Sequence, residues 1–327
     1  MPTTFWIVTL SSARSRVLGI GPQPPCACHW KRPDLPVSIG SRSNAIEFPL
    51  RLHSHSGEPY QIATRADQAP VRASRSGAPG PTGSAIRMRI EVSACTDTGR
   101  KRSANEDFHA VDEKLGLFVV ADGLGGHAAG RRASELGVAV FVETVARDPE
   151  GSGAEVLRRA ILRASDAIHE ASRAEPGLRG MGTTLAAIWL RGDEAALAHA
   201  GDSRLYLHRQ RRLCPLTLDH SLVGERVARG ELSADQARSH PSRHVITRAL
   251  GVLPWLEPDV ASIRARAGDL FLLCSDGISS QLEDAEIERC LELCAVGPAT
   301  APRALVQLAN ERGGEDNATA LIVAIVR

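Results

Sequence analysis

The sequence lacks three features that would each point to a common class of protein. No apolar run approaches the roughly 20 residues that span a bilayer, so no membrane segment is expected. None of the 7 cysteines forms a Cys-x-x-Cys pair, which disfavours a zinc site and favours reduced thiols in a cytoplasmic protein. The formal net charge is only +1, so the chain has no overall excess of positive charge for nucleic-acid binding.

The small net charge conceals two parts of opposite sign. Residues 1–87 carry 10 Lys and Arg against 4 Asp and Glu, whereas the remaining residues carry 29 against 34. The first part also contains 11 of the 19 prolines and no sustained hydrophobic period, which predicts a disordered basic extension. Met88 is a candidate for the true start of the protein, and residues 88–327 are predicted to form an acidic folded domain that does not bind nucleic acid.

Short apolar runs in the second part predict β-strands. Short polar turns at residues 191–193 and 201–203 join three of these runs, which indicates antiparallel hairpins. Two helices are predicted, at residues 133–146 and 155–174, and the second has an apolar stripe. Helices between antiparallel strands favour an α+β layered fold. The predicted strands are 115–121, 185–190, 195–200, 205–208, 270–274 and 318–326.

The stretch LFVVADGLGGHAAG, residues 117–130, ends an apolar run in an aspartate followed by glycines. The glycines could cradle a dinucleotide, Asp122 could hold a cation, or the segment could be a tight turn. A dinucleotide fold requires another parallel strand after the first helix, but a second helix is predicted there, which disfavours a nicotinamide-dependent oxidoreductase. The cation site and the simple turn both stay open on this stretch alone.

The pattern of a strand followed by a carboxylate recurs along the chain. Asp276 ends the run DLFLLCSDG and Asp316 precedes the last predicted strand, while RSANED contributes Glu106 and Asp107, and HAGDSR contributes Asp202. If the sheets bring these positions together, the accumulated negative charge raises the carboxylate pKa values and strains the fold unless cations neutralise it. Oxygen ligands of this kind favour magnesium or manganese.

Eight short motifs occur in a fixed order: RSANED, VVADGLGGHAAG, MGTT, AGDSR, LTLDHS, ITRALG, LLCSDG and DNAT. Together they resemble the motif series of the metal-dependent protein phosphatases, the PPM or protein phosphatase 2C-like family, in its bacterial form. The resemblance covers about residues 90–327 and implies an α-β-β-α sandwich, two antiparallel sheets flanked by helices, with the metal centre at one end. It also implies a serine/threonine protein phosphatase, a phosphoric monoester hydrolase that acts in signalling and opposes a bacterial kinase.

The resemblance implies a role for each carboxylate. Asp122 is expected to bridge two Mg²⁺ or Mn²⁺ ions, with the Gly123 carbonyl as a further ligand. A third, weaker metal site is also expected. The other implied ligands are Asp276 and Asp316 for the first metal, Glu106 and Asp107 for the second, and Asp202 together with Asp276 for the third.

Arg102 matches the arginine that binds the substrate phosphate in this family. A guanidinium can pair bidentately with phosphate oxygens and offset charge in the transition state. Metal ions lower the pKa of bound water towards about 7, which predicts direct attack by a metal-bridging hydroxide without a phosphoenzyme. Leu124 stands where eukaryotic members have a proposed acid histidine, so the general acid is not assigned.

Residues 217–245, here called the flap, match a mobile segment beside the active site of the family. The resemblance implies that the flap helps to choose protein substrates, while a solvated surface insertion is the alternative. A helix is predicted to start at Ser233. The expected enzyme is a monomer that acts on phosphorylated proteins and binds neither nucleic acid nor membrane. A pseudophosphatase with the same fold, sensing phosphate or serving as a scaffold, is the main alternative.

Overall fold

The computed structural model describes residues 52–53, 59–60, 89–126, 128–295 and 299–326 of the 327-residue chain. Strands β1 (Leu52–His53) and β2 (Pro59–Tyr60) pair antiparallel and belong to a separate compact unit. The rest of the predicted basic extension and the proposed start at Met88 lie outside the described residues, so both stay predictions. No helix among the described residues is long and apolar enough to cross a membrane.

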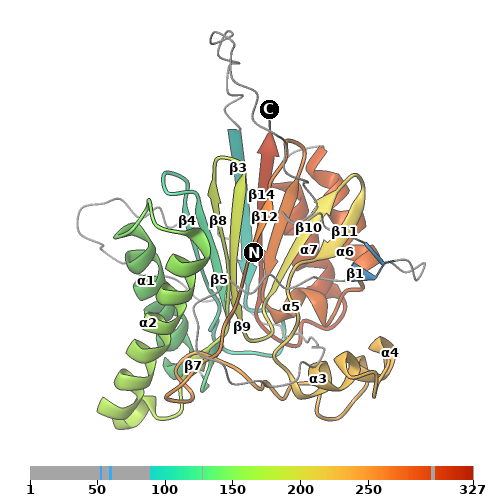
Figure 1. Ribbon diagram of the computed structural model, residues 1–327. Coiled ribbons are helices and arrows are strands. Elements are labelled where there is room, and N and C mark those ends of the chain that lie inside the picture. Colours follow the sequence, from blue (N-terminus) through green and yellow to red (C-terminus); the bar gives the residue numbers. More distant parts are fainter. Residues whose placement is uncertain (1–51, 54–58, 61–88, 127, 296–298, 327) are drawn as a thin grey trace, which may run out of the picture. The chain divides into compact units, whose positions relative to one another are not determined.

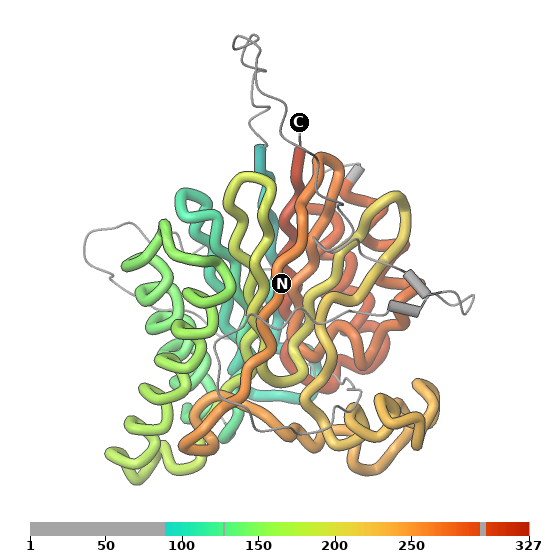
Figure 2. Tube along the Cα trace, in the orientation of Figure 1, coloured from blue at the N-terminus to red at the C-terminus, as the bar shows by residue number. Residues whose placement is uncertain are grey.

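Two five-stranded sheets form the centre of the unit that includes residues 89–326, and all their strands pair antiparallel (Figure 1). The first and last strands of this unit, β3 and β14, lie side by side (Figure 2). One sheet has the order β12-β9-β8-β5-β4: β12 (Asp259–Arg264), β9 (Glu194–Ala200), β8 (Leu185–Arg191), β5 (Leu117–Ala121) and β4 (Phe108–Asp112). The other has the order β11-β10-β13-β14-β3: β11 (Arg212–Pro215), β10 (Arg204–Arg209), β13 (Leu270–Cys274), β14 (Ala318–Val326) and β3 (Arg89–Asp97).

Helices cover the outer face of each sheet, which confirms the predicted α-β-β-α sandwich (Figure 1). One apolar core lies between α1 and α2 and their sheet, a second lies between α5, α6, α7 and the other sheet, and a third lies between the two sheets. The helices are α1 (Ala128–Ala146), α2 (Gly153–Ala174), α5 (Asp276–Ser279), α6 (Asp284–Glu292) and α7 (Thr300–Glu311).

Every residue of strand β5 is apolar because both faces of this strand are covered. Successive side chains of a strand point to opposite faces, and both faces of β5 are covered. Leu117 and Val119 belong to the core under the helices, whereas Phe118 and Val120 belong to the core between the sheets. All five residues of β5 are buried, so the continuous apolar run predicts its place correctly.

One predicted hairpin is wrong. Strands β8 and β9 pair as expected, but β9 lies in one sheet and β10 in the other. The three-residue connection 201–203 therefore carries the chain across the sandwich instead of reversing it within one sheet. A short polar turn does not distinguish these two geometries in the sequence. As a consequence, Asp202 lies where the chain crosses between the two sheets.

The flap contains two short helices, α3 (Leu222–Ala228) and α4 (Ala234–Arg238). Ser221 caps α3 by accepting a hydrogen bond from the Gly224 amide at 3.1 Å. Ser233 caps α4 within a complete capping box, which confirms the helix start predicted there. The ends of the flap are tied together by the Leu222 amide, which donates to the Val245 carbonyl at 2.8 Å.

Candidate active site

Asp122 follows β5 and precedes the two-residue strand β6 (Gly123–Leu124), which pairs with β7 (Gly182–Thr183). The Asp122 amide donates to Thr184 Oγ1 at 2.9 Å, and the Asp122 carbonyl accepts from the Thr184 amide and from Thr183 Oγ1, each at 2.8 Å. The backbone of Asp122 is thus fixed by the MGTT motif, some 60 residues away in the chain.

Two glycines allow Glu106 to approach Asp122. The Gly123 amide donates to the Glu106 carbonyl at 3.2 Å. A Cβ atom on Gly123 would overlap the Gly130 carbonyl and lie 2.8 Å from the Glu106 carbonyl, and one on Gly130 would overlap the Glu106 carboxylate. Neither position has room for a side chain, which explains the glycines after the aspartate better than a simple turn does.

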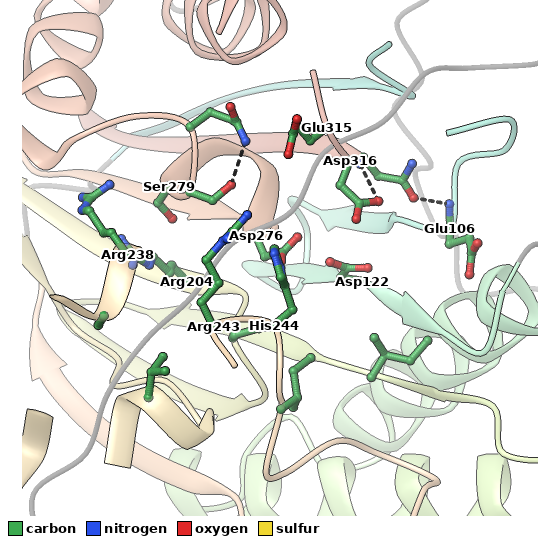
Figure 3. A pocket seen from close by; sticks show the side chains of 18 of the residues that line it. Glu106, Asp122, Arg204, Arg238, Arg243, His244, Asp276, Ser279, Glu315 and Asp316 are labelled. Atoms are coloured by element: carbon green, nitrogen blue, oxygen red, sulfur yellow. Dashed lines mark hydrogen bonds between the residues drawn. The ribbon is translucent and has the colours of Figure 1, made fainter. Parts of the chain in front are cut away.

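The other predicted carboxylates come from three further segments. Asp202 lies in the crossing between the sheets, Asp276 is the first residue of α5, and Asp316 precedes β14. These three residues, Glu106 and Asp122 all line one pocket of about 910 Å³ (Figure 3). The structure therefore brings five of the six predicted carboxylate positions to one cavity.

Asp107, the sixth carboxylate, is buried and does not line this pocket. Its Oδ2 atom accepts hydrogen bonds from Ser275 Oγ and Thr319 Oγ1, each at 2.6 Å. Besides burial, the negative charges of Asp122 and Glu106 nevertheless raise the pKa of Asp107. Its position suits a group that supports the site without lining the pocket.

An asparagine that was not singled out in the sequence holds the segment of Glu106 in place. Asn317 Oδ1 accepts from the Glu106 amide at 2.7 Å, and Asn317 Nδ2 donates to the Ala104 carbonyl at 3.1 Å. Asn317 belongs to the DNAT motif, which was the only signal for it. This side chain links the ends of two segments that are more than 200 residues apart.

Burial raises the pKa values of four aspartates in the cluster, and neighbouring carboxylates raise three of these values further. Burial first, then the charge of Asp202, raises the pKa of Asp122 to about 7. Burial also raises the pKa of Asp202 to about 7. The pKa values of Asp107 and Asp276 lie well above their usual range because of burial and the neighbouring Asp122. The buried carboxylates are therefore stabilised when they either bind protons or lie next to cations.

The donor set fits divalent metal ions such as magnesium or manganese. Asp107 Oδ1 and Asp276 Oδ1 are buried and accept no hydrogen bond from the described part of the chain. Buried carboxylate oxygens without donors carry a desolvation penalty that a cation would offset. All the polar atoms that the predicted ligands offer are oxygens, which hard divalent ions prefer.

Arg102 lines the same pocket and forms an ion pair with Asp316. Its side chain is 47% exposed, so the guanidinium can reach a molecule that enters from solvent. The sequence prediction that Arg102 meets a phosphate at this site is compatible with this position.

Two residues that could act as alternative nucleophiles are engaged elsewhere. Ser203 Oγ lies 2.6 Å from Thr184 Oγ1, in a buried hydrogen bond. Burial raises the pKa of the Cys274 thiol to about 12, so it carries almost no thiolate at neutral pH. Neither residue lines the pocket.

Two buried histidines support the crossing that carries Asp202. His220 Nδ1 accepts from the Gly201 amide at 3.2 Å, and its Nε2 lies 3.2 Å from Asp259 Oδ2. The ring centroid of His199 is 4.6 Å from that of His220. These contacts fit a structural role for both rings. His127, the other histidine near the site, lies outside the described residues.

Comparisons with known proteins agree with the geometry. Residues 97–311 match the family described as Protein phosphatase 2C. The chain is 38% identical over 241 residues to the serine/threonine protein phosphatase PstP of Mycobacterium tuberculosis, covering 74% of this chain and 46% of PstP. It is 35% identical over 243 residues to the protein phosphatase PhpP of Streptococcus pneumoniae, covering 72% of this chain and 98% of PhpP. The chain thus spans about half the length of PstP and nearly all of PhpP.

A solved structure of the PstP catalytic domain in complex with two manganese ions is also similar. Its sequence is 36% identical and its TM-score is 0.67, with 73% of this chain and 100% of that chain covered. The family match spans more than half of the chain, and both sheets with their flanking helices agree with the fold of these relatives. The chain belongs to the protein phosphatase 2C or PPM family, the magnesium- or manganese-dependent serine/threonine protein phosphatases.

Proposed function

We propose that residues 88–327 form a phosphatase domain that removes phosphate from phosphoserine and phosphothreonine in proteins. The observation that carries the proposal is the convergence of carboxylates from five segments of the chain in one pocket, where burial raises the pKa values of Asp122, Asp202 and Asp276. Such a cluster is stable at neutral pH when cations occupy it. The proposed ligands of two Mg²⁺ or Mn²⁺ ions, and of a third weaker one, are Glu106, Asp107, Asp122, Gly123, Asp202, Asp276 and Asp316.

Bound metal ions would supply the nucleophile by lowering the pKa of a coordinated water towards about 7. The chain itself fixes the carboxylates through the hydrogen bonds to Asp122 and Glu106. Arg102, freed from Asp316, is proposed to hold two phosphate oxygens and to offset their charge during hydrolysis. Because Ser203 and Cys274 are engaged or protonated, the proposal contains no phosphoenzyme.

The pseudophosphatase alternative gains no support. Every predicted carboxylate position retains an acidic residue, and five of the six line the pocket. The substrates are proposed to include a bacterial serine/threonine kinase or its targets, because the relatives include bacterial serine/threonine protein phosphatases. A location in the cytoplasm is proposed from the free cysteines among the described residues, and the monomeric state stays a prediction.

The proposal is tested with a phosphothreonine peptide, the full chain and residues 88–327, assayed with Mn²⁺ and with chelator. We expect Mn²⁺-dependent hydrolysis by both proteins, and a loss of about 100-fold or more in Asp276→Asn. Asp166→Asn, an exposed carboxylate on α2, is the matched control and should retain full activity. Hydrolysis that resists both the chelator and Asp276→Asn would contradict the proposed site.

A further inference from the structure

The charges that line the pocket do not all belong to the proposed metal site. Three acidic residues of the lining have a basic partner: Asp316 pairs with Arg102, Asp284 lies 3.6 Å from Arg204, and Glu315 lies 3.2 Å from Lys101. The other lining carboxylates, Glu106, Asp122, Asp202 and Asp276, belong together with Asp316 to the proposed metal site. The lining also contains two further arginines, Arg238 and Arg243, which form no ion pair with these acidic residues in the described part of the chain.

Arg238 and Arg243 both come from the flap and face the pocket (Figure 3). Arg238 is exposed and donates one hydrogen bond, from Nη1 to the Leu282 carbonyl at 3.4 Å, and it has no ion pair among the described residues. Arg243 is half-buried and has neither a side-chain hydrogen bond nor an ion pair within the described ranges. Each guanidinium thus keeps most of its donors available.

Other arginines of the flap behave differently. Arg226 pairs with Glu231 at 3.1 Å, and Arg229 pairs with Glu225 at 3.2 Å, so these two are neutralised within the flap itself. Neither lines the pocket. The flap therefore presents to the cavity those of its arginines that lack an acidic partner, while it pairs others on its own surface.

Backbone hydrogen bonds tie both ends of the flap to the chain crossing that carries Asp202. The His220 amide donates to the Gly201 carbonyl at 2.8 Å, which ties the start of the flap to the residue before Asp202. The Thr247 amide donates to the His220 carbonyl at 2.7 Å and closes the other end. In Figure 3, Arg238 and Arg243 lie on one side of Asp276, and Asp122 and Glu106 lie on the other.

We propose that Arg238 and Arg243 form a subsite for a second anionic group of the substrate, close in sequence to the phosphoresidue that is hydrolysed. The pocket, at about 910 Å³, lies at the upper end of the range for small-molecule sites and has room for a peptide segment. A peptide with its phosphate at Arg102 would place a neighbouring residue beside the flap. Arginine pairs bidentately with both phosphate and carboxylate, so the ligand class is an acidic or doubly phosphorylated peptide. This inference rests on the proposed phosphatase function.

The test measures kcat/KM of the full chain with Mn²⁺ on three phosphothreonine peptides that differ only in their flanks: neutral residues, glutamates, or a second phosphothreonine. A small substrate, p-nitrophenyl phosphate, reports the chemistry alone. We expect the wild type to favour the anionic peptides by about fivefold to tenfold, as for charged contacts at a partly exposed site. A larger gain from the second phosphothreonine than from glutamate would identify phosphate as the preferred anion, and the reverse would identify carboxylate.

Arg238→Ala together with Arg243→Ala should abolish the preference and leave p-nitrophenyl phosphate hydrolysis unchanged. When position 243 carries lysine instead of alanine, Arg243→Lys should keep part of the preference for anionic peptides. Arg229→Ala is the matched control and should retain the whole preference. The subsite is overturned if the double variant keeps the preference, or if it loses activity equally on every substrate. If the wild type hydrolyses p-nitrophenyl phosphate but shows no preference for the anionic peptides, the subsite is overturned and the proposed phosphatase function is not. No Mn²⁺-dependent hydrolysis of any substrate overturns the proposed function as well.

Discussion

The pocket has two walls that are built in different ways. The carboxylate wall consists of strand ends and tight turns whose groups are buried, hydrogen-bonded and raised in pKa. The flap wall consists of two short capped helices and the turn after them, and its two arginines that line the pocket, Arg238 and Arg243, are exposed or half-buried. Chemistry that is sensitive to small displacements is placed on the rigid wall, and groups that can adapt to different substrates are placed on the other. Changes on the first wall should therefore affect every substrate, and changes on the second should affect few.

The largest expected effect comes from adding one methyl group to the rigid wall. Gly130 lies in α1, where alanine is normally the better residue by about 0.5–1 kcal/mol. Its Cβ would overlap the Glu106 carboxylate and lie 2.9 Å from the backbone carbonyl oxygen of Gly123, so Gly130→Ala should instead destabilise the protein by about 2 kcal/mol or more and lower activity on all substrates. Chemical denaturation and the p-nitrophenyl phosphate assay measure both effects. Gly177→Ala, where a Cβ meets nothing within 4 Å, should change neither the stability nor the activity appreciably.

A smaller effect is expected when a supporting side chain of the same wall is removed. Asn317→Ala deletes the acceptor of the Glu106 amide and the donor to the Ala104 carbonyl. Groups that orient metal ligands typically contribute 10–100-fold, so the Mn²⁺ concentration for half-maximal activity should rise by about 10-fold or more. Asn317→Asp, which retains the acceptor, should restore part of the loss. An unchanged Mn²⁺ requirement would show that Asn317 does not position Glu106.

The rigid wall should also make the metal-free protein sensitive to pH. The pKa of Asp122 rises from 3.8 to about 7 on folding, so between these values the folded state binds more protons than the unfolded state. The free energy of unfolding should therefore fall as the pH rises from about 4 to about 7, by on the order of 1 kcal/mol per pH unit for this group, and should level off at higher pH. Denaturation in chelator at several pH values measures this loss.

Two comparisons isolate the carboxyl contribution from that of other groups. Asp122→Asn should show a shallower pH dependence than the wild type, because the substituted side chain does not titrate. Added Mn²⁺ should remove most of the wild-type loss, since the ions replace the protons. Equal slopes for the wild type and Asp122→Asn in chelator would contradict the raised pKa.

The smallest effect is expected on the flap wall. Ser233 accepts from the Gln236 amide at 3.2 Å, and Ser233→Ala removes this cap from α4. Loss of a cap costs about 1 kcal/mol, but here the effect is confined to one exposed turn. Hydrogen exchange of α4 should accelerate, while p-nitrophenyl phosphate hydrolysis stays within about twofold of the wild type. A large loss on this small substrate would show that the two walls are not independent.

The sequence predicted the six interior strands of the two sheets, β5, β8, β9, β10, β13 and β14, whose residues are mostly buried. β13 and β14 begin and end where the apolar runs do, because a covered strand tolerates few polar residues. β12 was missed because it is an edge strand with mostly exposed or half-buried residues, including Asp259 and Arg264. The hairpin predicted between β9 and β10 was wrong because a short turn does not reveal in which sheet the next strand lies.

The same limit applies to the site. The aspartates were predictable because each follows or precedes an apolar strand, and the motif order added the roles of Arg102 and Glu106. The supporting contacts of Asn317 and Ser275 were not predictable, since they join segments far apart in the chain and depend on the fold. Arg238 and Arg243 had no signal beyond their place in the flap, because their exposure to the pocket is a tertiary property.

The most direct test of the carboxylate wall counts the metal ions that it holds. Titration of Mn²⁺ into the full chain, followed by the electron paramagnetic resonance signal of the free ion, measures binding without any assay of activity. We expect two tightly bound ions in the wild type and in Asp166→Asn, and at most one, bound about 100-fold more weakly, in Asp122→Asn. Equal binding by the wild type and Asp122→Asn would contradict the claim that Asp122 is shared between two metal ions.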